Sequence, residues 1–92
     1  MIPKFNLGRV VMTHGVAEWV SESPEIRNLF PLLDRHIRGD WGELDEEDIQ
    51  TNNEALTLNN RILSSYTLDG EKIWIITEWD RSSTTVLFPS EY

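Results

Sequence analysis

The stretch RILSSYTLDGEKIWIITEW, residues 61–79, decides the fold because it predicts an antiparallel hairpin. Asp69-Gly70 at its centre is typical of a two-residue turn, since both residue types tolerate positive φ angles. Such a turn fixes the strand register, so that Ile62 faces Thr77 across the pair. The sequence therefore predicts two paired strands joined by this turn.

Side-chain alternation along these strands predicts a sheet that is partly apolar on both faces. One face carries Ile62, Tyr66, Ile73 and Ile75. The other face carries Leu63, Trp74 and Ile76 beside the charged residues Arg61, Lys72 and Glu78. We therefore expect either that both faces are covered by the rest of the chain or that one of them faces a partner.

The residues before the hairpin predict helices. Ser23-Pro24-Glu25 has the composition of a helix start, because serine caps the first N–H groups and proline is favoured in the first turn. Pro31 is expected to divide this helix into two pieces, and Gly39 to end the second piece. Asp45 is expected to cap a further helix, which Asn59-Asn60 ends.

Two more strands are predicted near the ends of the chain. A β-branched run within residues 5–13 predicts a short first strand, which Gly15 breaks, and Thr84–Phe88 predicts a last strand before Pro89. The sequence as a whole predicts an α+β fold with a short N-terminal strand, three or four short helices, and a C-terminal antiparallel meander of three strands packed on the helices. Its length suits a single domain, residues 1–92.

The composition narrows the chemistry that the chain can perform. There is no cysteine, so disulfides, thiolate ligands and a cysteine nucleophile are excluded. The two histidines are too few for an ordinary zinc site, and no phosphate loop or dinucleotide fingerprint is present, so we expect neither a metal nor a cofactor. The longest apolar runs, residues 73–76 and 86–88, are too short to span a membrane, which predicts a cytoplasmic protein.

Sixteen acidic residues against eight basic ones give a net charge of −8. Direct binding to nucleic acid is not expected, because phosphate contacts favour basic proteins. The charge favours solubility, and it also fits a basic protein partner or mimicry of a nucleic acid. The modest apolar share of 39% is compatible with a monomer or with a homodimer that buries additional apolar surface.

Five stretches form a recognisable pattern: FNLGRVV (5–11), HIRGDWGEL (36–44), RILSSY (61–66), KIWIITE (72–78) and DRSSTT (80–85). In them the chain resembles a family of short uncharacterised proteins of bacterial plasmids, integrative elements and prophages. Members are sometimes labelled as type I restriction methylase subunits, but a methylase needs a cofactor-binding α/β sheet with a glycine-rich loop, which a chain this short lacks. The resemblance implies a mobile genetic element as the setting and no established activity.

His36 and Asp40 are the first catalytic candidates. Four residues apart, they could share a helix face, and histidine–carboxylate pairs act as general bases. Gly39 is expected to end the helix between them, which spoils this geometry. The alternative is a charged histidine that stabilises the negative end of a helix.

A second candidate is the polar cluster Glu78, Asp80, Arg81 and Ser82 at a predicted strand end and turn. The hairpin register places Arg61 opposite Glu78. Carboxylate, guanidinium and hydroxyl groups together can bind phosphate or orient a water molecule. The alternative is a cross-strand ion pair beside an aspartate-initiated turn.

The candidate binding residues are acidic and aromatic. Residues 40–54 hold seven carboxylates and no lysine or arginine, and Glu46, Glu47 and Asp48 fall in one predicted helical turn. Such a row could imitate the phosphates of DNA, although the positive end of the helix alone explains its position. Trp79 is a candidate contact for a partner, whereas Trp41 is expected in the core.

Two classes of function remain open from the sequence. The first is a non-enzymatic interaction or accessory protein of a mobile genetic element, which includes an acidic inhibitor of a host defence enzyme. The second is a small ribonuclease-like toxin or other small enzyme, for which His36, Arg61, Glu78 and Arg81 would form the site; this rests on analogy of fold alone. An antitoxin-like or structural partner without chemistry is a third possibility.

Overall fold

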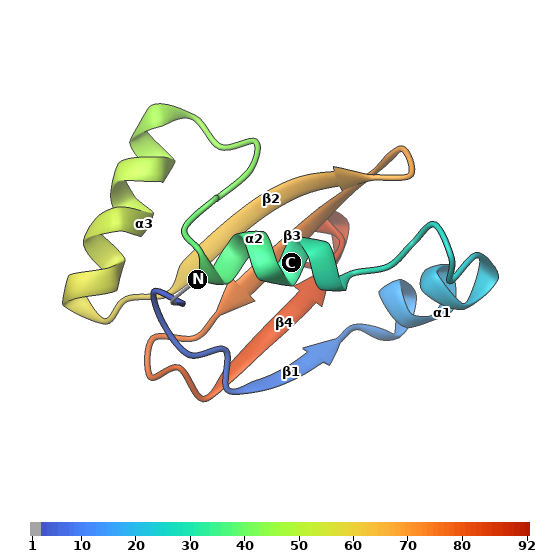
Figure 1. Cartoon of the computed structure of the whole chain (residues 1–92), viewed down its shortest axis with the longest axis horizontal. Helices are drawn as coiled ribbons and strands as arrows, with labels where there is room; N and C mark the ends of the chain where they lie inside the picture. Colours follow the sequence, from blue (N-terminus) through green and yellow to red (C-terminus); the bar gives the residue numbers. More distant parts are fainter. Residues whose placement is uncertain (1–2) are drawn as a thin grey trace.

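The predicted hairpin forms one half of a four-stranded sheet in the computed structural model, which describes residues 3–92 (Figure 1). Strands β2 (Ile62–Leu68) and β3 (Glu71–Thr77) pair antiparallel in the predicted register, which is thereby confirmed. Asp69 and Gly70 have φ angles of 48° and 79°, and a type I′ turn requires positive φ at both positions.

The strand order across the sheet is β1-β4-β3-β2. Strand β4 (Ser83–Leu87) runs antiparallel to β3, which confirms the predicted meander. Strand β1 (Arg9–Met12) adds to the far side of β4 and runs parallel to it, with Val10 opposite Thr84. The residue pattern predicted this strand but not its partner, because a parallel pairing is set by the path of the chain between the two strands.

The first helix, α1 (His14–Glu22), begins where β1 ends. Thr13 caps it by accepting a hydrogen bond from the backbone N–H of Val16 at 3.2 Å. The predicted strand lies within residues 5–13, but it ends before Gly15, because Thr13 makes the change of direction and Gly15 lies in the first turn of α1. The cap and the buried side chain of Val16 stabilise a helix start that the glycine alone would weaken.

The helix predicted to start at Ser23-Pro24-Glu25 does not form, and that prediction was wrong. Ser23 instead ends α1, and residues 24–26 make a turn. Arg27 holds this linker, because it donates hydrogen bonds to the carboxylate of Asp69 at 2.8 Å and to the carbonyl of Trp19 at 2.7 Å. The linker is thus fixed by contacts with distant residues, and local cap signals do not reveal such contacts.

The other two helices follow their predicted signals more closely. Helix α2 (Phe30–Ile37) carries Pro31 in its first turn, where the missing N–H group costs nothing. Helix α3 (Glu46–Leu58) is capped by the side chain of Asp45, and Asn59 ends it with a φ angle of 54°. Three α-helices and a mixed sheet within residues 3–92 confirm the predicted α+β class.

The outer edge of β2 is covered by the chain that precedes it. Asn52 of α3 accepts a hydrogen bond from the N–H of Leu63 at 3.2 Å and donates one to the carbonyl of Leu63 at 2.6 Å. Further along, Ser65 donates its N–H to the carbonyl of Trp41 at 3.0 Å and forms a parallel bridge with Gly42. These contacts satisfy backbone groups that an edge strand would otherwise expose.

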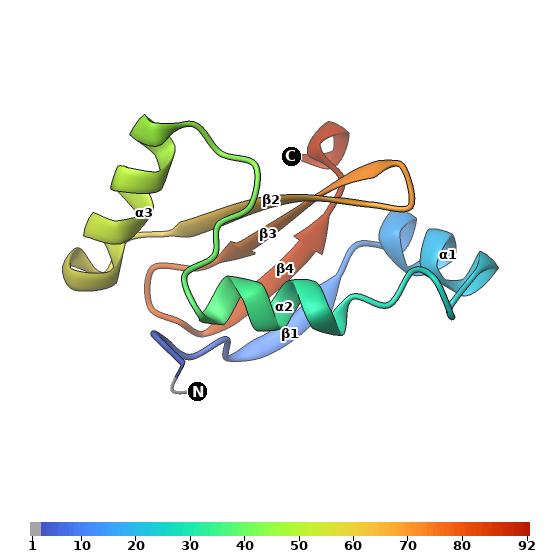
Figure 2. The same cartoon turned by 45° about the horizontal axis from the view of Figure 1, so that its top comes forward.

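Helix α2 lies on one face of the sheet, and the short 3₁₀ helix Pro89–Glu91 lies on the other side (Figure 2). The face toward α2 carries Ile62, Tyr66, Ile73 and Ile75, which were predicted to share one face and are all fully buried. Helical and linker residues pack on this set, namely Val16, Leu29 and Leu32. Trp41 is buried beside Ile62, as predicted.

No helix within residues 3–92 has the length and apolar character needed to cross a membrane.

Candidate functional site

His36 is fully buried between α2 and the sheet. Its Nδ1 lies 2.5 Å from Ser64 Oγ and its Nε2 lies 2.9 Å from Thr77 Oγ1. Burial, aided by the positive charge of Arg81, lowers the pKa of His36 to about 3. His36 is therefore neutral at physiological pH, and it does not stabilise the end of α2 as a cation.

The hydrogen bonds of His36 continue through the interior. The hydroxyls of Thr77 and Thr84 lie 2.7 Å apart, and Thr84 donates to the carbonyl of Leu7 at 2.7 Å. Every buried side-chain nitrogen or oxygen within residues 3–92 has a hydrogen-bond partner. This fully satisfied network joins α2 and the N-terminal segment to the sheet, and the side chains of His36, Thr77 and Thr84 in it are fully buried.

Asp40 does not pair with His36. Its carboxylate accepts hydrogen bonds from Arg35 Nε at 2.7 Å and Arg35 Nη2 at 3.2 Å, and it also accepts the N–H of Gly42. The hydrogen bond from Arg35 holds the pKa of Asp40 below its usual range. Asp40 therefore stays ionised and fixes the turn after α2.

The predicted polar cluster at the end of β3 forms a local turn: Arg81 donates to the carbonyl of Glu78 at 3.0 Å, and the carboxylate of Asp80 accepts the N–H of Ser82 at 3.0 Å. Arg61 lies 3.7 Å from the carboxylate of Glu78, as the hairpin register requires, and also donates to the hydroxyl of Tyr92. Arg81 also donates to backbone carbonyls at the end of α3, those of Ala55 at 2.9 Å and Asn60 at 2.7 Å. Arg81 thus secures the C-terminus of α3, and its positive charge lies close enough to the buried His36 to lower the pKa of that histidine.

The candidate binding residues are all exposed. Glu46, Glu47 and Asp48 occupy the first turn of α3, as predicted, and none of them forms an ion pair within residues 3–92. The side chain of Trp79 is 64% exposed after the end of β3. The same part of the chain contains no group of three histidine or carboxylate side chains that could hold a metal ion.

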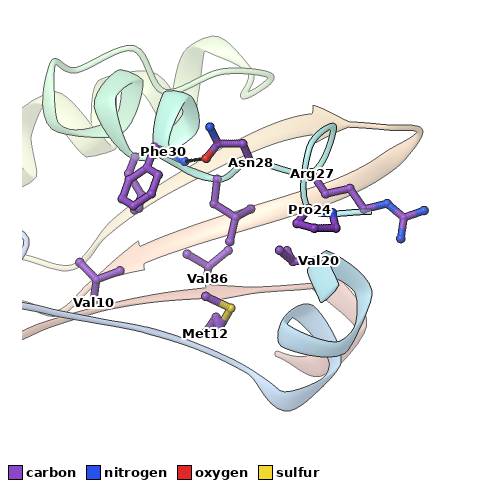
Figure 3. A pocket seen from close by; sticks show the side chains of 10 residues that line it. Val10, Met12, Val20, Pro24, Arg27, Asn28, Phe30 and Val86 are labelled. Atoms are coloured by element: carbon purple, nitrogen blue, oxygen red, sulfur yellow. Dashed lines mark hydrogen bonds between the residues drawn. The ribbon is translucent and has the colours of Figure 1, made fainter. Parts of the chain in front are cut away.

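An apolar groove of about 380 Å³ lies between the sheet and the segment that leads into α2. Val10, Met12 and Val86 form its floor on the sheet, and Phe30 and Val20 stand on its other sides (Figure 3). Phe30, in the first turn of α2, is 77% exposed. Such an exposed apolar hollow is typical of a surface that another molecule covers.

Strand β1 contributes Val10 and Met12 to the floor of this groove and is the open edge of the sheet. The N–H of Arg9 bonds to the carbonyl of Ser82, and the N–H of Thr13 bonds to the carbonyl of Val86, each at 3.0 Å. Backbone groups alternate in direction along a strand, so the N–H and C=O groups of Val10 and Met12 point away from β4. Both residues therefore present unpaired backbone groups at the edge and apolar side chains in the groove.

The two edge strands of the sheet therefore differ in how far other residues cover them. Asn52 and the chain around Gly42 cover β2, whereas all four residues of β1 are exposed and no strand within residues 3–92 pairs with its outer side. Natural edge strands are usually protected by charges, proline or bulges. Arg9 is the one charged residue in β1. An apolar, unprotected edge beside an apolar groove is the strongest candidate site in the described chain.

Sequence reasoning missed this site although one signal was present. The run Val10-Val11-Met12 predicts a strand, but the sequence does not show which strand pairs with it and so does not mark it as an edge. Comparison of the chain with models of known protein families, with curated proteins and with solved structures gave no match. The candidate site therefore stands on its geometry alone.

Proposed function

We propose that this chain is a non-enzymatic binding protein that accepts an extended segment of another polypeptide at the open edge of β1. The observation that carries the proposal is the arrangement of Val10 and Met12, whose backbone groups face outward while their side chains line the apolar groove. In strand addition, main-chain hydrogen bonds supply affinity and pockets for alternate side chains supply specificity. The edge and the groove offer both.

The alternative of a small enzyme gains no support from the geometry. His36 is buried and hydrogen bonded on both ring nitrogens, and Arg81 is engaged with backbone carbonyls. Arg61 and Glu78 form a half-exposed ion pair. A reaction site needs such groups to converge on one accessible point.

The net charge of −8 favours a partner surface that carries basic residues, and the exposed carboxylates of Glu46, Glu47 and Asp48 would contribute to that attraction. We place the protein in the cytoplasm on the same sequence grounds as above. The setting of a mobile genetic element, and inhibition of a defence enzyme in particular, rests on the sequence resemblance alone.

A synthetic strand tests the proposal. The probe is an acetylated heptapeptide, Lys-Val-Thr-Val-Thr-Val-Lys, which alternates apolar and polar residues and carries the opposite charge to the protein. Titrated into the isotope-labelled chain, it should shift the amide NMR signals of Val10, Met12 and the groove residues. In a sample that sediments as a monomer, absence of any shift at β1 at millimolar peptide contradicts strand addition.

Two variants at one position separate backbone pairing from apolar contact. Val10→Pro removes an outward N–H, which does not take part in the pairing with β4, so the fold should persist and peptide binding should be lost. Val10→Ala keeps that N–H and should retain binding with reduced affinity. Equal peptide binding by both variants would mean that the edge hydrogen bonds play no part.

A further inference from the structure

We infer that the extended segment accepted at β1 is β1 of a second copy of the same chain, so that two sheets join into one across a two-fold axis. The inference rests on the proposed function and names the partner of that same edge. The edge combines outward backbone groups with an apolar groove and would bind a strand with apolar side chains at alternate positions. Strand β1 itself has this character, with Val10 and Met12 as the apolar side chains and Arg9 as a cation at one end.

The direction of the backbone groups fixes the register. In an antiparallel pair, hydrogen-bonded positions need residues whose N–H and C=O groups both face the partner, and on β1 these are Val10 and Met12. Val10 opposite Met12 of the second copy, and the reverse, uses every outward group of both residues. The two-fold axis then passes beside Val11, which faces Val11 of the second copy.

Other symmetric registers use fewer groups. Val10 opposite Val10 would place Met12 opposite Gly8, whose φ angle of 64° is not that of a strand. Met12 opposite Met12 would place Val10 opposite His14, which already belongs to α1. Each of these two registers forms fewer intermolecular hydrogen bonds at the ends of the paired strands, so the register centred on Val11 is preferred.

The side chains agree with this register. Directly opposite residues of an antiparallel pair lie on the same face, so Val10 meets Met12 of the second copy on the face of α2. These side chains are 42% and 45% exposed in the single chain, and the exposed ring of Phe30 stands over the same groove. On the opposite face, Val11 packs against Val11. The pairing removes a continuous apolar strip from water.

The ends of the strand carry complementary charges. Arg9 lies opposite Thr13 of the second copy, and both lie on the face away from α2. The hydroxyl of Thr13 donates to the carboxylate of Glu91 at 2.7 Å, so Arg9 of one copy comes close to Glu91 of the other. Arg9 forms no ion pair within residues 3–92 of its own chain.

The net charge of −8 opposes association of two copies, but its distribution limits the cost. The acidic first turn of α3 lies beside β2, at the edge of the sheet opposite to β1. At physiological ionic strength, interactions between exposed charges are largely screened beyond about 8 Å. The repulsion between the distant acidic turns of the two copies is therefore largely screened.

Single cysteines report the register directly, because the chain has no cysteine of its own. Cα atoms of a non-hydrogen-bonded antiparallel pair lie about 4.5 Å apart, which is within the range of a disulfide. Val11→Cys should therefore give a covalent dimer on mild oxidation. Val10→Cys is the matched control, since its counterpart in the second copy lies two residues further along the strand. Equal crosslinking of the two variants, or crosslinking of neither, would overturn the register.

Sedimentation velocity on the unmodified protein measures the association itself. The sedimentation coefficient of the wild-type protein should correspond to twice the mass of one chain. Val10→Pro removes one outward donor per copy, and the loss of two hydrogen bonds of about 1 kcal/mol each corresponds to about 30-fold weaker dimerisation. A wild type that stays monomeric up to about 100 μM, well above the Kd of most specific dimers, overturns the inference.

The heptapeptide titration separates this inference from the proposed function. A monomeric wild type whose Val10 and Met12 amides respond to the peptide would retain strand addition at β1 and exclude the second copy as its partner. A wild type that neither dimerises nor binds the peptide would remove both.

Discussion

The Nε2 atom of His36 lies 2.9 Å from the hydroxyl oxygen of Thr77, in a fully buried site that joins α2 to the sheet. Each ring nitrogen of His36 has a hydroxyl partner, and no carboxylate is among them. The site therefore suits a neutral imidazole, and it makes the stability of the fold depend on pH.

Acid should destabilise the protein through His36. Burial lowers its folded pKa to about 3, whereas the unfolded value is about 6.5. At pH values between these two, the imidazole of His36 is protonated in the unfolded chain and neutral in the folded chain. Stability is therefore full above about pH 6.5 and falls as the pH falls, with a slope that approaches about 1.4 kcal/mol per pH unit.

Urea unfolding between pH 7 and pH 4.5 measures this slope while most carboxylates remain ionised. His14→Gln, which removes the exposed second histidine, is the control and should keep the slope. A free energy of unfolding that is flat across this interval would show that His36 is protonated in the folded protein.

Arg81 should stabilise the folded protein through its hydrogen bonds to carbonyls at the C-terminal end of α3. Its φ angle of 60° is unfavourable for residues other than glycine, and its guanidinium donates to the carbonyls of Ala55 and Asn60. Arg81→Ala loses the hydrogen bonds and keeps the strained backbone, so we expect a loss of about 1–3 kcal/mol in chemical denaturation. Arg81→Gly loses the same bonds without the strain and should be more stable than Arg81→Ala by about 1 kcal/mol. The reverse order would show that backbone strain at position 81 does not contribute to the loss.

Gly42 and Gly70 form a matched pair, because both have a φ angle of 79°. A Cβ on Gly42 would lie 2.0 Å from the carbonyl oxygen of Ser65, whereas a Cβ on Gly70 would meet nothing within 4 Å. Gly70→Ala should therefore cost about 1 kcal/mol for the backbone alone, and Gly42→Ala should cost clearly more because it displaces the cover on β2. Thermal unfolding of the two variants tests this, and equal losses would contradict the close approach at Gly42.

Phe30 should matter for association and not for folding. Its ring is 77% exposed beside the groove, so Phe30→Ser should change the free energy of unfolding by no more than about 0.5 kcal/mol. The same variant should weaken both the response to the heptapeptide and the dimer. Ile26→Ser removes another exposed apolar side chain outside the groove and should change neither. Identical effects of the two variants would remove the groove from the binding surface.

The sequence by itself determined those parts of the protein that short-range geometry controls. Asp69-Gly70 set the hairpin register because a two-residue turn leaves only one pairing. Asp45 and Asn59 marked the ends of α3 because capping and left-handed backbone depend on single residues. The exposed carboxylates at the start of α3 and the burial of Trp41 also followed from local pattern.

Only the tertiary structure decided how distant segments meet. The parallel pairing of β1 with β4, the engagement of Arg81 with α3, and the burial of His36 against Thr77 all join residues more than 20 positions apart. Such contacts depend on the path of the whole chain, which no local pattern encodes. The candidate site is the clearest case, because Val10 and Met12 are an open edge only once the position of every other strand is known.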